Sequence, residues 1–266
     1  MSATTTISTY LLQRLHELKL THLFGVPGDY VLDFLDQVIE SPLAWVGTCN
    51  ELNGGYAADG YARMHGIGAA VVTYGVGGFS VLNAVAGAFA EMVPLVLISG
   101  APPLKRRAGK ALVHHLVADY DRQLEIFRKV TVDAALLHDP ATAPALIDRV
   151  LAACVTRKLP VYLELPADRA RAVCQPPAGP LLLPGRTSNP EHLSACAVAI
   201  AERLNQAQRP VLLAGIEVPR FGLGPQLLSL VEQVELPFAV MLSSKSSLPE
   251  LHPQYKIGRA SCRERV

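Results

Sequence analysis

Long uninterrupted apolar runs, paired cysteines and a strong charge of either sign are all missing from this 266-residue sequence. Its five cysteines lie far apart, with no Cys-x-x-Cys pair and no metal-like spacing, so we expect reduced thiols in a cytoplasmic protein. Residues Met1–Thr9 lack the basic start and apolar core of a signal peptide. The apolar stretch Ala69–Pro103 is interrupted by Asn83, Glu91 and several glycines, which favours buried strands and a helix over a membrane span.

The C-terminal tail, Lys256–Val266, distorts the charge of the chain. The formal net charge is +1, but removing the tail's four basic residues and one acidic residue leaves 20 Lys and Arg against 22 Asp and Glu. The tail has no apolar period, and its back-translation resembles a common sequencing adapter, so we predict that residues 256–266 are non-native. A basic arm that binds nucleic acid is the alternative interpretation. Without the tail, no basic excess indicates a nucleic-acid partner.

Strand-like and helical segments alternate along residues 1–174. The predicted strands are His22–Val26, Ala44–Thr48, Ala69–Tyr74, Leu95–Ser99 and Val161–Leu165. The predicted helices are Ile7–Leu18, Tyr30–Ile39, one beginning at Glu51, one ending near Met92, Asp121–Phe127 and Ala141–Arg157. We predict a loop with a basic run at Leu104–Leu116. This alternation is typical of an α/β protein with a doubly wound parallel sheet and helices on both faces.

Prolines and glycines concentrate in residues 175–190, which we interpret as a semi-rigid linker. Helix and strand patterns resume after it, at Glu191–Asn205, Pro210–Gly215, Pro225–Val234 and Phe238–Leu242. The segment 191–255 is too short for a complete doubly wound domain. We therefore predict the start of a second, truncated α/β domain, and a natural chain that continues beyond Tyr255.

The stretch Asn50–Arg63 is the most distinctive in the sequence. Glu51 follows a strand predicted to be buried and begins a helix, which puts its carboxylate at the sheet edge where ligands bind. A carboxylate in that position could simply satisfy free N–H groups at the helix start. That alternative does not explain Gly54 and Gly55, because each glycine weakens a helix by roughly 1 kcal/mol relative to alanine. The glycines indicate a close approach of the backbone to another group.

Two further positions could take part in proton transfer. Asp29 follows Pro27 and Gly28, where turn propensities alone favour a helix cap. His114 and His115 are adjacent, as in many loops and some metal sites. No cysteine or acidic ligand stands at zinc spacing from them, so we expect no metal there. Histidine exchanges protons near neutral pH, which suits general acid–base chemistry.

The segment Thr73–Ser80 ends a predicted strand in a glycine-rich loop. It could be mistaken for a dinucleotide-binding fingerprint, but its glycines do not follow the G-x-G-x-x-G spacing with an acidic residue downstream. We therefore interpret it as a tight turn between a strand and a helix.

The Glu51 segment resembles the glutamate motif of the thiamine diphosphate-dependent 2-oxo acid decarboxylases, the group of pyruvate, indolepyruvate and phenylpyruvate decarboxylases. The likeness covers Thr6–Tyr255. It implies a thiamine diphosphate-binding fold whose first domain binds the pyrimidine ring. It further implies that Glu51 bonds that ring and helps to make the reactive ylide, and that Val76 contacts the pyrimidine.

The resemblance also changes the interpretation of the turn and the histidines. It places Pro27 and Gly28 at the cofactor and Asp29 beside the reacting carbon. His114 and His115 look like the diagnostic pair of the decarboxylases, which acetolactate synthases and benzoylformate decarboxylases lack. The following residues, Leu116-Val117-Ala118, depart from the more usual polar and glycine residues.

The resemblance implies an activity that the visible chain cannot complete. The implied reaction is non-oxidative decarboxylation of a 2-oxo acid to an aldehyde and carbon dioxide with thiamine diphosphate and Mg²⁺. The Gly-Asp-Gly motif that binds magnesium and diphosphate in this family is missing, and a dimer or tetramer is implied because subunits share the cofactor. Thr73-Tyr74-Gly75 and Asn83–Gly87 look closest to the aryl-pyruvate branch. The alternatives are a carboligating relative such as acetolactate synthase, and an inactive truncated fragment.

Overall fold

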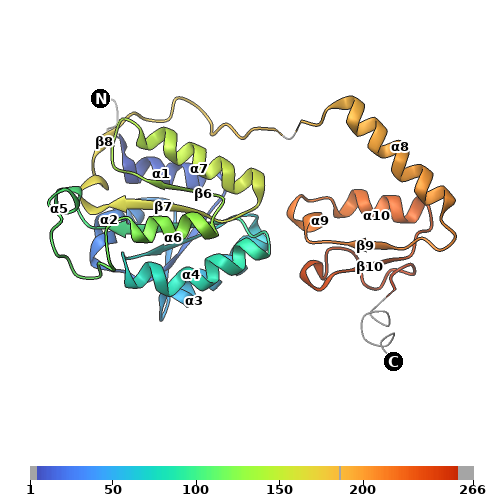
Figure 1. Ribbon diagram of the computed structural model, residues 1–266, viewed down its shortest axis with the longest axis horizontal. Helices are drawn as coiled ribbons and strands as arrows, with labels where there is room; N and C mark the ends of the chain where they lie inside the picture. Colours follow the sequence, from blue (N-terminus) through green and yellow to red (C-terminus); the bar gives the residue numbers. More distant parts are fainter. Residues whose placement is uncertain (1–4, 186, 257–266) are drawn as a thin grey trace. The chain divides into compact units, whose positions relative to one another are not determined.

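The computed structural model describes residues 5–185 and 187–256, which divide into two compact units, Met1–Pro184 and Gly185–Val266 (Figure 1). The first unit is built on a six-stranded parallel sheet with the strand order β3-β2-β4-β5-β7-β6. Its strands are β2 (His22–Gly25), β3 (Ala44–Gly47), β4 (Gly68–Val72), β5 (Leu95–Ala101), β6 (Asp133–Leu136) and β7 (Val161–Pro166). The predicted α/β fold with a parallel sheet is confirmed.

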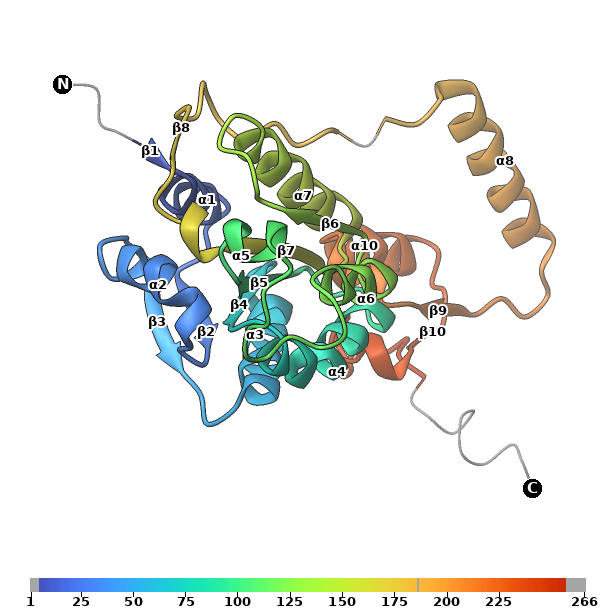
Figure 2. The ribbon, with the colours of Figure 1, turned by 60° about the vertical axis from the view of Figure 1, so that its left-hand side comes forward.

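Helices cover both faces of this sheet (Figures 1 and 2). One face carries α1 (Ile7–Glu17), α2 (Leu32–Ile39) and α7 (Ala143–Arg157); the other carries α3 (Glu51–His65), α4 (Val76–Ala90) and α6 (Arg122–Val130). Alternate residues of a strand point to opposite faces, so Val71 of β4 joins the first apolar cluster and Val72 joins the second. Both faces of the central strands are therefore buried, as expected for a parallel sheet.

The paired glycines of α3 serve close packing. A Cβ on Gly54 would lie 3.0 Å from the Cα of Gly25 in β2, and a Cβ on Gly55 would lie 2.6 Å from the Cγ2 of Val81 in α4. Ala58 and Ala62 continue the same buried small-residue face. The helix thus lies against both a strand and a neighbouring helix, which fixes the direction in which its first residue, Glu51, points.

Three local predictions were wrong. The strand β3 was expected to be buried, but it lies at the edge of the sheet and is exposed or half-buried along its length. The strand β6 was missed because this four-residue edge strand has no β-branched or aromatic side chain to mark it. The predicted loop after Pro103 begins with a short helix, α5 (Leu104–Ala108), which contains the basic run.

The chain after the last strand of the sheet stays attached to the first unit. The short strands β1 (Thr5–Thr6) and β8 (Val173–Cys174) pair antiparallel. Arg14 donates to the carbonyl of Gly179 at 2.8 Å, and the amide of Leu181 donates to Glu17 at 2.5 Å. The first part of the predicted linker is therefore fixed by hydrogen bonds to α1.

The second unit has a small parallel sheet of β9 (Leu212–Ala214) and β10 (Phe238–Val240), with helices α8 (Pro190–Gln206), α9 (Glu217–Arg220) and α10 (Gly224–Gln233). Its apolar core centres on Val231 and Phe238 and includes no residue of α8, whose side chains are almost all exposed. Most of the predicted non-native tail lies outside the described residues. No helix within residues 5–185 and 187–256 combines the length and apolar character needed to cross a membrane.

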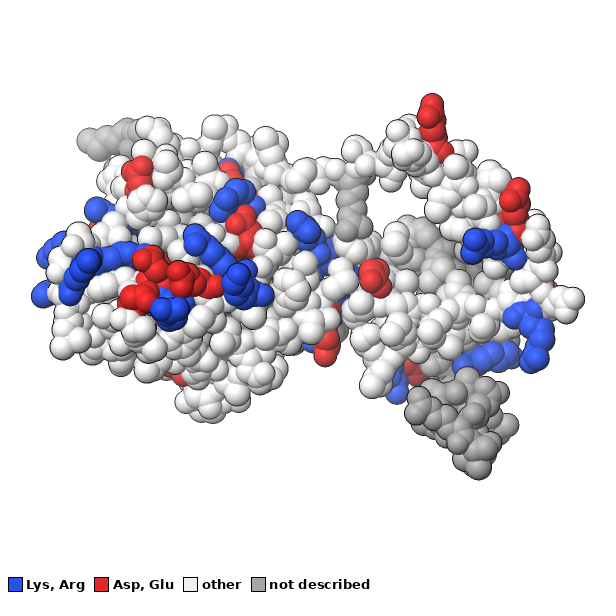
Figure 3. Space-filling model, viewed as in Figure 1, with Lys and Arg blue, Asp and Glu red and all other residues white. Residues whose placement is uncertain are grey.

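Basic and acidic side chains are interspersed on the face of the molecule that Figure 3 shows. Ion pairs in the first unit include Arg122 with Asp119 at 2.8 Å and Arg149 with Asp133 at 3.1 Å. A nucleic-acid interface instead typically gathers Lys and Arg on one face. On the face that Figure 3 shows, basic side chains of the first unit lie next to acidic ones.

Candidate active site

The predicted site residues lie after the carboxyl ends of β2, β3 and β4 and in the loop that follows β5 and α5. From β2 the chain moves outward to β3 on one side, whereas β4 and β5 follow on the other side of β2. The loops after β2 and β4 therefore diverge at a topological switch point, where open α/β sheets bind their ligands. Asp29 follows β2, Glu51 follows β3, and Thr73–Val76 follows β4.

Thr73 was not among the predicted site residues, but it contacts both turns of this region. Its Oγ1 donates to Oδ1 of Asp29 at 3.3 Å. A Cβ on Gly28 would lie 2.5 Å from the Cβ of Thr73, and a Cβ on Gly77 would lie 3.0 Å from its Cγ2. Both glycines are therefore required for the turns after β2 and β4 to pack on this threonine. No sequence signal marked Thr73, because its contacts come from segments far away in the chain.

Glu51 is not used to cap its own helix. The cap of α3 is Asn50, whose side-chain oxygen accepts from the amide of Asn53 at 2.9 Å. The Glu51 side chain is half-buried, and within the described residues it forms no hydrogen bond or ion pair. A Cβ on Gly77 would lie 3.4 Å from its Oε1, which places the carboxylate beside the start of α4. The capping interpretation of Glu51 was therefore wrong, and its carboxylate is available to a ligand.

Asp29 and His114 form the central pair of the site. The carboxylate of Asp29 is in contact with Nε2 of His114, and both side chains are about half exposed, at 46% and 58%. Asp29 lies in a single turn, η1 (Asp29–Val31), and its side chain makes no helix cap. The capping interpretation was wrong for this residue too.

Tyr30 orients His114. The two rings stack with centroids 4.8 Å apart, and the tyrosine hydroxyl lies 3.3 Å from Nδ1 of His114. Burial, and then the charge of Asp29, raise the pKa of Tyr30, so the phenol stays protonated at neutral pH. Because Nδ1 is engaged by Tyr30, Nε2 of the same ring is directed to Asp29.

His115 is held by its backbone. It has φ of 65°, and a Cβ on Gly75 would lie 1.9 Å from its carbonyl oxygen, so the turn after β4 supports it directly. Its Nδ1 is buried without a hydrogen-bond partner in the part of the chain that the structure describes. Leu116 packs on Tyr30 and Tyr74, while Ala118 adopts φ of 65°. Leu116 therefore provides an apolar contact for the loop. The left-handed conformation of Ala118 is about 1–2 kcal/mol less favourable in free energy than the right-handed helical one.

Pro27 is exposed at the turn after β2, and Val76, the first residue of α4, is 52% exposed. Because these residues are exposed, a cofactor could reach Pro27, Gly28 and Val76, as the resemblance implies. Glu51 offers a free carboxylate, and the glycines around Thr73 leave a surface without side chains. These features fit the pyrimidine ring that the resemblance implies, and we expect Glu51 to be its hydrogen-bond partner.

A buried polar chain behind the site was not anticipated from the sequence. The amide of Gly75 donates to Gln123 at 2.7 Å, Gln123 donates to the hydroxyl of Tyr162 at 2.7 Å, and Tyr162 donates to Glu164 at 2.8 Å. Glu164 is fully buried, and Nη1 of Arg107 lies 3.5 Å from its Oε1. Burial raises the pKa of the Glu164 carboxyl to about 7. The basic run interpreted as a solvated loop thus supplies one internal ion-pair partner.

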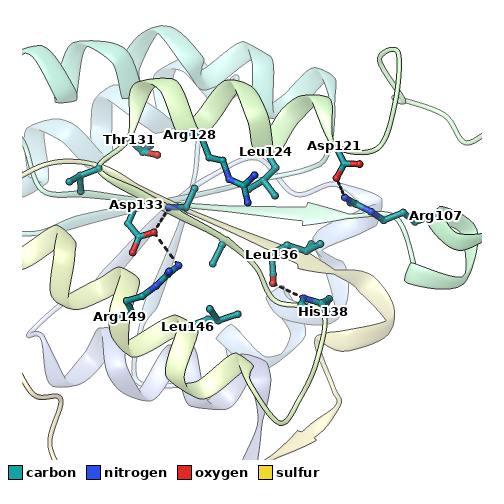
Figure 4. Close-up of a pocket in the computed structure, with 13 residues that line it drawn as sticks. Arg107, Asp121, Leu124, Arg128, Thr131, Asp133, Leu136, His138, Leu146 and Arg149 are labelled. Carbon is teal, nitrogen blue, oxygen red and sulfur yellow. Dashed lines mark hydrogen bonds and ion pairs between the residues drawn. The ribbon is translucent and has the colours of Figure 1, made fainter.

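A recess of about 670 Å³ lies elsewhere, between α6, α7 and β6 (Figure 4). It is lined by charged groups that pair with one another, such as Arg149 with Asp133 and Arg107 with Asp121. None of the predicted site residues lines it. The candidate active site is therefore the shallow edge around Thr73 and not this recess.

Comparisons with known proteins show which family the chain resembles. Residues 5–125 match the family profile described as the thiamine pyrophosphate enzyme N-terminal TPP binding domain, and residues 198–265 match that of the central domain. An alpha-keto-acid decarboxylase of Mycobacterium leprae is 43% identical over 260 residues, covering 96% of this chain and 45% of the relative. A probable pyruvate decarboxylase of Schizosaccharomyces pombe is 40% identical over 256 residues, again covering 45% of the relative. The chain spans less than half the length of these curated relatives.

Proposed function

Because the chain belongs to the thiamine pyrophosphate enzymes, we propose that the complete protein is a non-oxidative 2-oxo acid decarboxylase. The observation that carries the proposal is the convergence of Asp29, His114 and His115 on one cluster, together with Glu51, which has no hydrogen-bond or ion-pair partner among the described residues. Relatives named alpha-keto-acid decarboxylase and pyruvate decarboxylase match over most of the chain.

Thiamine diphosphate supplies the electron sink that accepts the electron pair left by carbon dioxide. The residues of this chain have three tasks around it. Glu51 would bond the pyrimidine ring, where a carboxylate would favour activation of the cofactor. The carboxylate of Asp29 contacts the imidazole of His114 at a position open to substrate, and this pair would orient the substrate and pass a proton to it. His115, fixed by the Gly75 turn, would offer a second imidazole to protonate the carbon that has lost carbon dioxide.

A carboligating relative such as acetolactate synthase is the second candidate. Decarboxylation to an aldehyde needs a proton donor at the carbon that has lost carbon dioxide, whereas carboligation needs that carbon to attack a second substrate. The side chains of Asp29, His114 and His115 have nitrogen and oxygen atoms within 4.8 Å of one another. Groups of this kind can donate a proton, which favours decarboxylation over carboligation. The decarboxylase is therefore the better-supported candidate.

Glu51→Gln in the complete protein is the direct test. We expect turnover to fall on the order of 10²-fold or more, because glutamine accepts a hydrogen bond but lacks the negative charge. Hydrogen–deuterium exchange at the reactive carbon of the cofactor should slow in parallel, and Asn53→Gln, an exposed position on the same helix, serves as control. An unchanged exchange rate in Glu51→Gln would assign Glu51 a different role.

We propose a preference for an aryl or long-chain 2-oxo acid over pyruvate, supported by the likeness of Thr73-Tyr74-Gly75 to the aryl-pyruvate branch. Two other sequence features would favour the same branch, namely Gly78, which stands where pyruvate decarboxylases often carry a glutamate, and the apolar Phe89, but the structure does not support either argument. A Cβ on Gly78 would lie 2.5 Å from Gln123, so this glycine is a packing residue, and Phe89 lies about 20 Å along α4 from Val76. The measurement is kcat/KM for phenylpyruvate, indolepyruvate and pyruvate on one preparation. A pyruvate value above both aromatic values would remove this branch assignment alone.

The remaining parts of the proposal concern the complete protein. Mg²⁺ and the diphosphate would be held outside this chain, which spans only 45% of the length of the Mycobacterium leprae relative. Sharing of the cofactor between subunits makes a dimer or tetramer part of the proposal. A cytoplasmic location, from the separated cysteines, also belongs to it.

A further inference from the structure

The segment between α5 and α6, residues 109–121, carries both predicted site histidines and contains no helix or strand. Arg107 stands two residues before this histidine loop and reaches its far end. Its Nη1 donates to the carbonyl of Tyr120 at 3.1 Å, and its Nη2 contacts the carboxylate of Asp121 (Figure 4). We propose that Arg107 is a positioning residue, which holds both histidines at the candidate active site by closing the loop that carries them.

The histidine loop depends on such contacts for its shape. Lys110, His115 and Ala118 all have positive φ, between 48° and 65°. Side chains disfavour this region by about 1–2 kcal/mol per residue, so a loop with three such residues keeps one conformation only where its surroundings impose it. Leu112 in the same loop is 94% exposed, so its apolar side chain does not anchor the loop.

Arg107 is fixed from the side of the protein core. Its Nη1 lies 3.5 Å from Oε1 of Glu164, a buried carboxylate oxygen that has no hydrogen-bond partner among the described residues. The Arg107 side chain is itself only 21% exposed. A guanidinium has five N–H donors in a rigid plane and can serve several acceptors at once, whereas a lysine ammonium is a point charge on a flexible stem. An arginine at this position can therefore bind Glu164 and the far end of the loop together.

Tyr120 carries this contact into the loop. The residue is 8% exposed, and its carbonyl accepts a second hydrogen bond, from the hydroxyl of Tyr74 at 3.2 Å. Its own hydroxyl donates to the carbonyl of Ala111 at 2.6 Å, near the start of the loop. Arg107 therefore fixes a residue that joins both ends of the loop, and the two histidines lie between those ends.

The first test is the opening of the loop in the 266-residue chain, without cofactor or substrate, so that it does not depend on the proposed function. Trypsin cleaves after the exposed Lys110 when the loop opens, and the rate follows the population of the open form. We expect Arg107→Lys to be cleaved there on the order of tenfold faster than the wild type, because lysine keeps the charge beside Glu164 but cannot bridge the loop. Equal rates would overturn the proposal.

Two references separate an open loop from a less stable protein. Arg106→Lys is the matched control, because the exposed side chain of Arg106 forms no hydrogen bond or ion pair in the part of the chain that the structure describes, and we expect the wild-type rate. Cleavage after Arg149, in α7, is the internal reference, and a parallel rise there in Arg107→Lys would mean general destabilisation and overturn the proposal. The NMR signals of His114 and His115 should shift in Arg107→Lys and not in Arg106→Lys.

The second test uses the complete protein, and its expected result rests on the proposed function. The kcat of Arg107→Lys should fall on the order of tenfold, more than KM changes, because proton transfer is sensitive to displacements of about 1 Å. Arg106→Lys should match the wild type in both constants. An unchanged kcat beside faster cleavage would confine Arg107 to the shape of the loop and overturn its positioning role. A wild-type complete protein without decarboxylase activity would instead overturn the proposed function, while the cleavage and NMR results would still decide whether Arg107 closes the loop.

Discussion

Two acid–base pairs in the first unit use similar residues in opposite environments. Asp29 and His114 meet at the open edge of the sheet with about half of each side chain exposed, whereas Glu164 and Arg107 meet inside it, with the carboxylate fully buried. The exposed pair can receive a ligand because water already solvates it. The buried pair is closed to ligands and holds the Gly75 turn through Tyr162 and Gln123. Burial therefore distinguishes the two pairs. The exposed pair is open to a ligand, and the buried pair supports the Gly75 turn.

The largest effect that we expect concerns the buried carboxylate. The pKa of Glu164 is raised from its ordinary value of 4.5 to about 7, so the folded protein holds this proton more tightly than the unfolded chain. The stability from this group is fully present below pH 4.5 and is lost as pH rises through 7. The loss is about 3 kcal/mol of unfolding free energy. Urea titrations followed by Trp45 fluorescence at several pH values measure it.

Glu164→Gln isolates this contribution, because glutamine keeps the shape and does not titrate. We expect the pH dependence of its unfolding free energy to be flatter than that of the wild type across this window. Glu125→Gln removes an exposed carboxylate from α6 and controls for loss of a charge. Parallel curves for Glu164→Gln and the wild type would show that burial does not govern this group.

A smaller effect is expected from Gln123→Leu. The substitution leaves the buried amide of Gly75 without its acceptor and removes a donor from Tyr162. An unsatisfied buried group costs about 1–3 kcal/mol, so we expect a loss of about 2 kcal/mol in unfolding free energy. Chemical denaturation gives the value, and NMR signals of the His114 and His115 rings should shift because the Gly75 turn supports them.

Asp29→Asn is the matched change in the exposed pair. Exposed ion pairs contribute at most about 1 kcal/mol, so its unfolding free energy should change less than that of Gln123→Leu. If Asp29→Asn proved the more destabilising of the two, the division between an open functional pair and a buried supporting chain would be wrong.

Periodicity and turn residues predicted most of the first unit. Strands of continuous apolar residues such as Ala69–Val72 and helices such as α7 lie where the pattern placed them, because local patterning decides which face of each element is buried. The edge strands were poorly predicted, since an edge strand has one neighbour and needs fewer apolar side chains. Their environment is a property of the sheet and cannot be read from four residues.

The sequence marked Glu51 by the glycines of its helix and His114 and His115 by their pairing, whereas Asp29 was selected by the resemblance to the decarboxylases. The catalytic roles of these four residues stay predictions. Tertiary structure alone decided what joins them. Thr73 contacts the turns after two different strands, and Gln123 connects Gly75 to Tyr162 across 48 and 39 residues of chain. It also decided that one acid–base pair is exposed and the other buried. Partners so far apart in sequence leave no local pattern, since only the packing of the strands and helices brings them within hydrogen-bond distance.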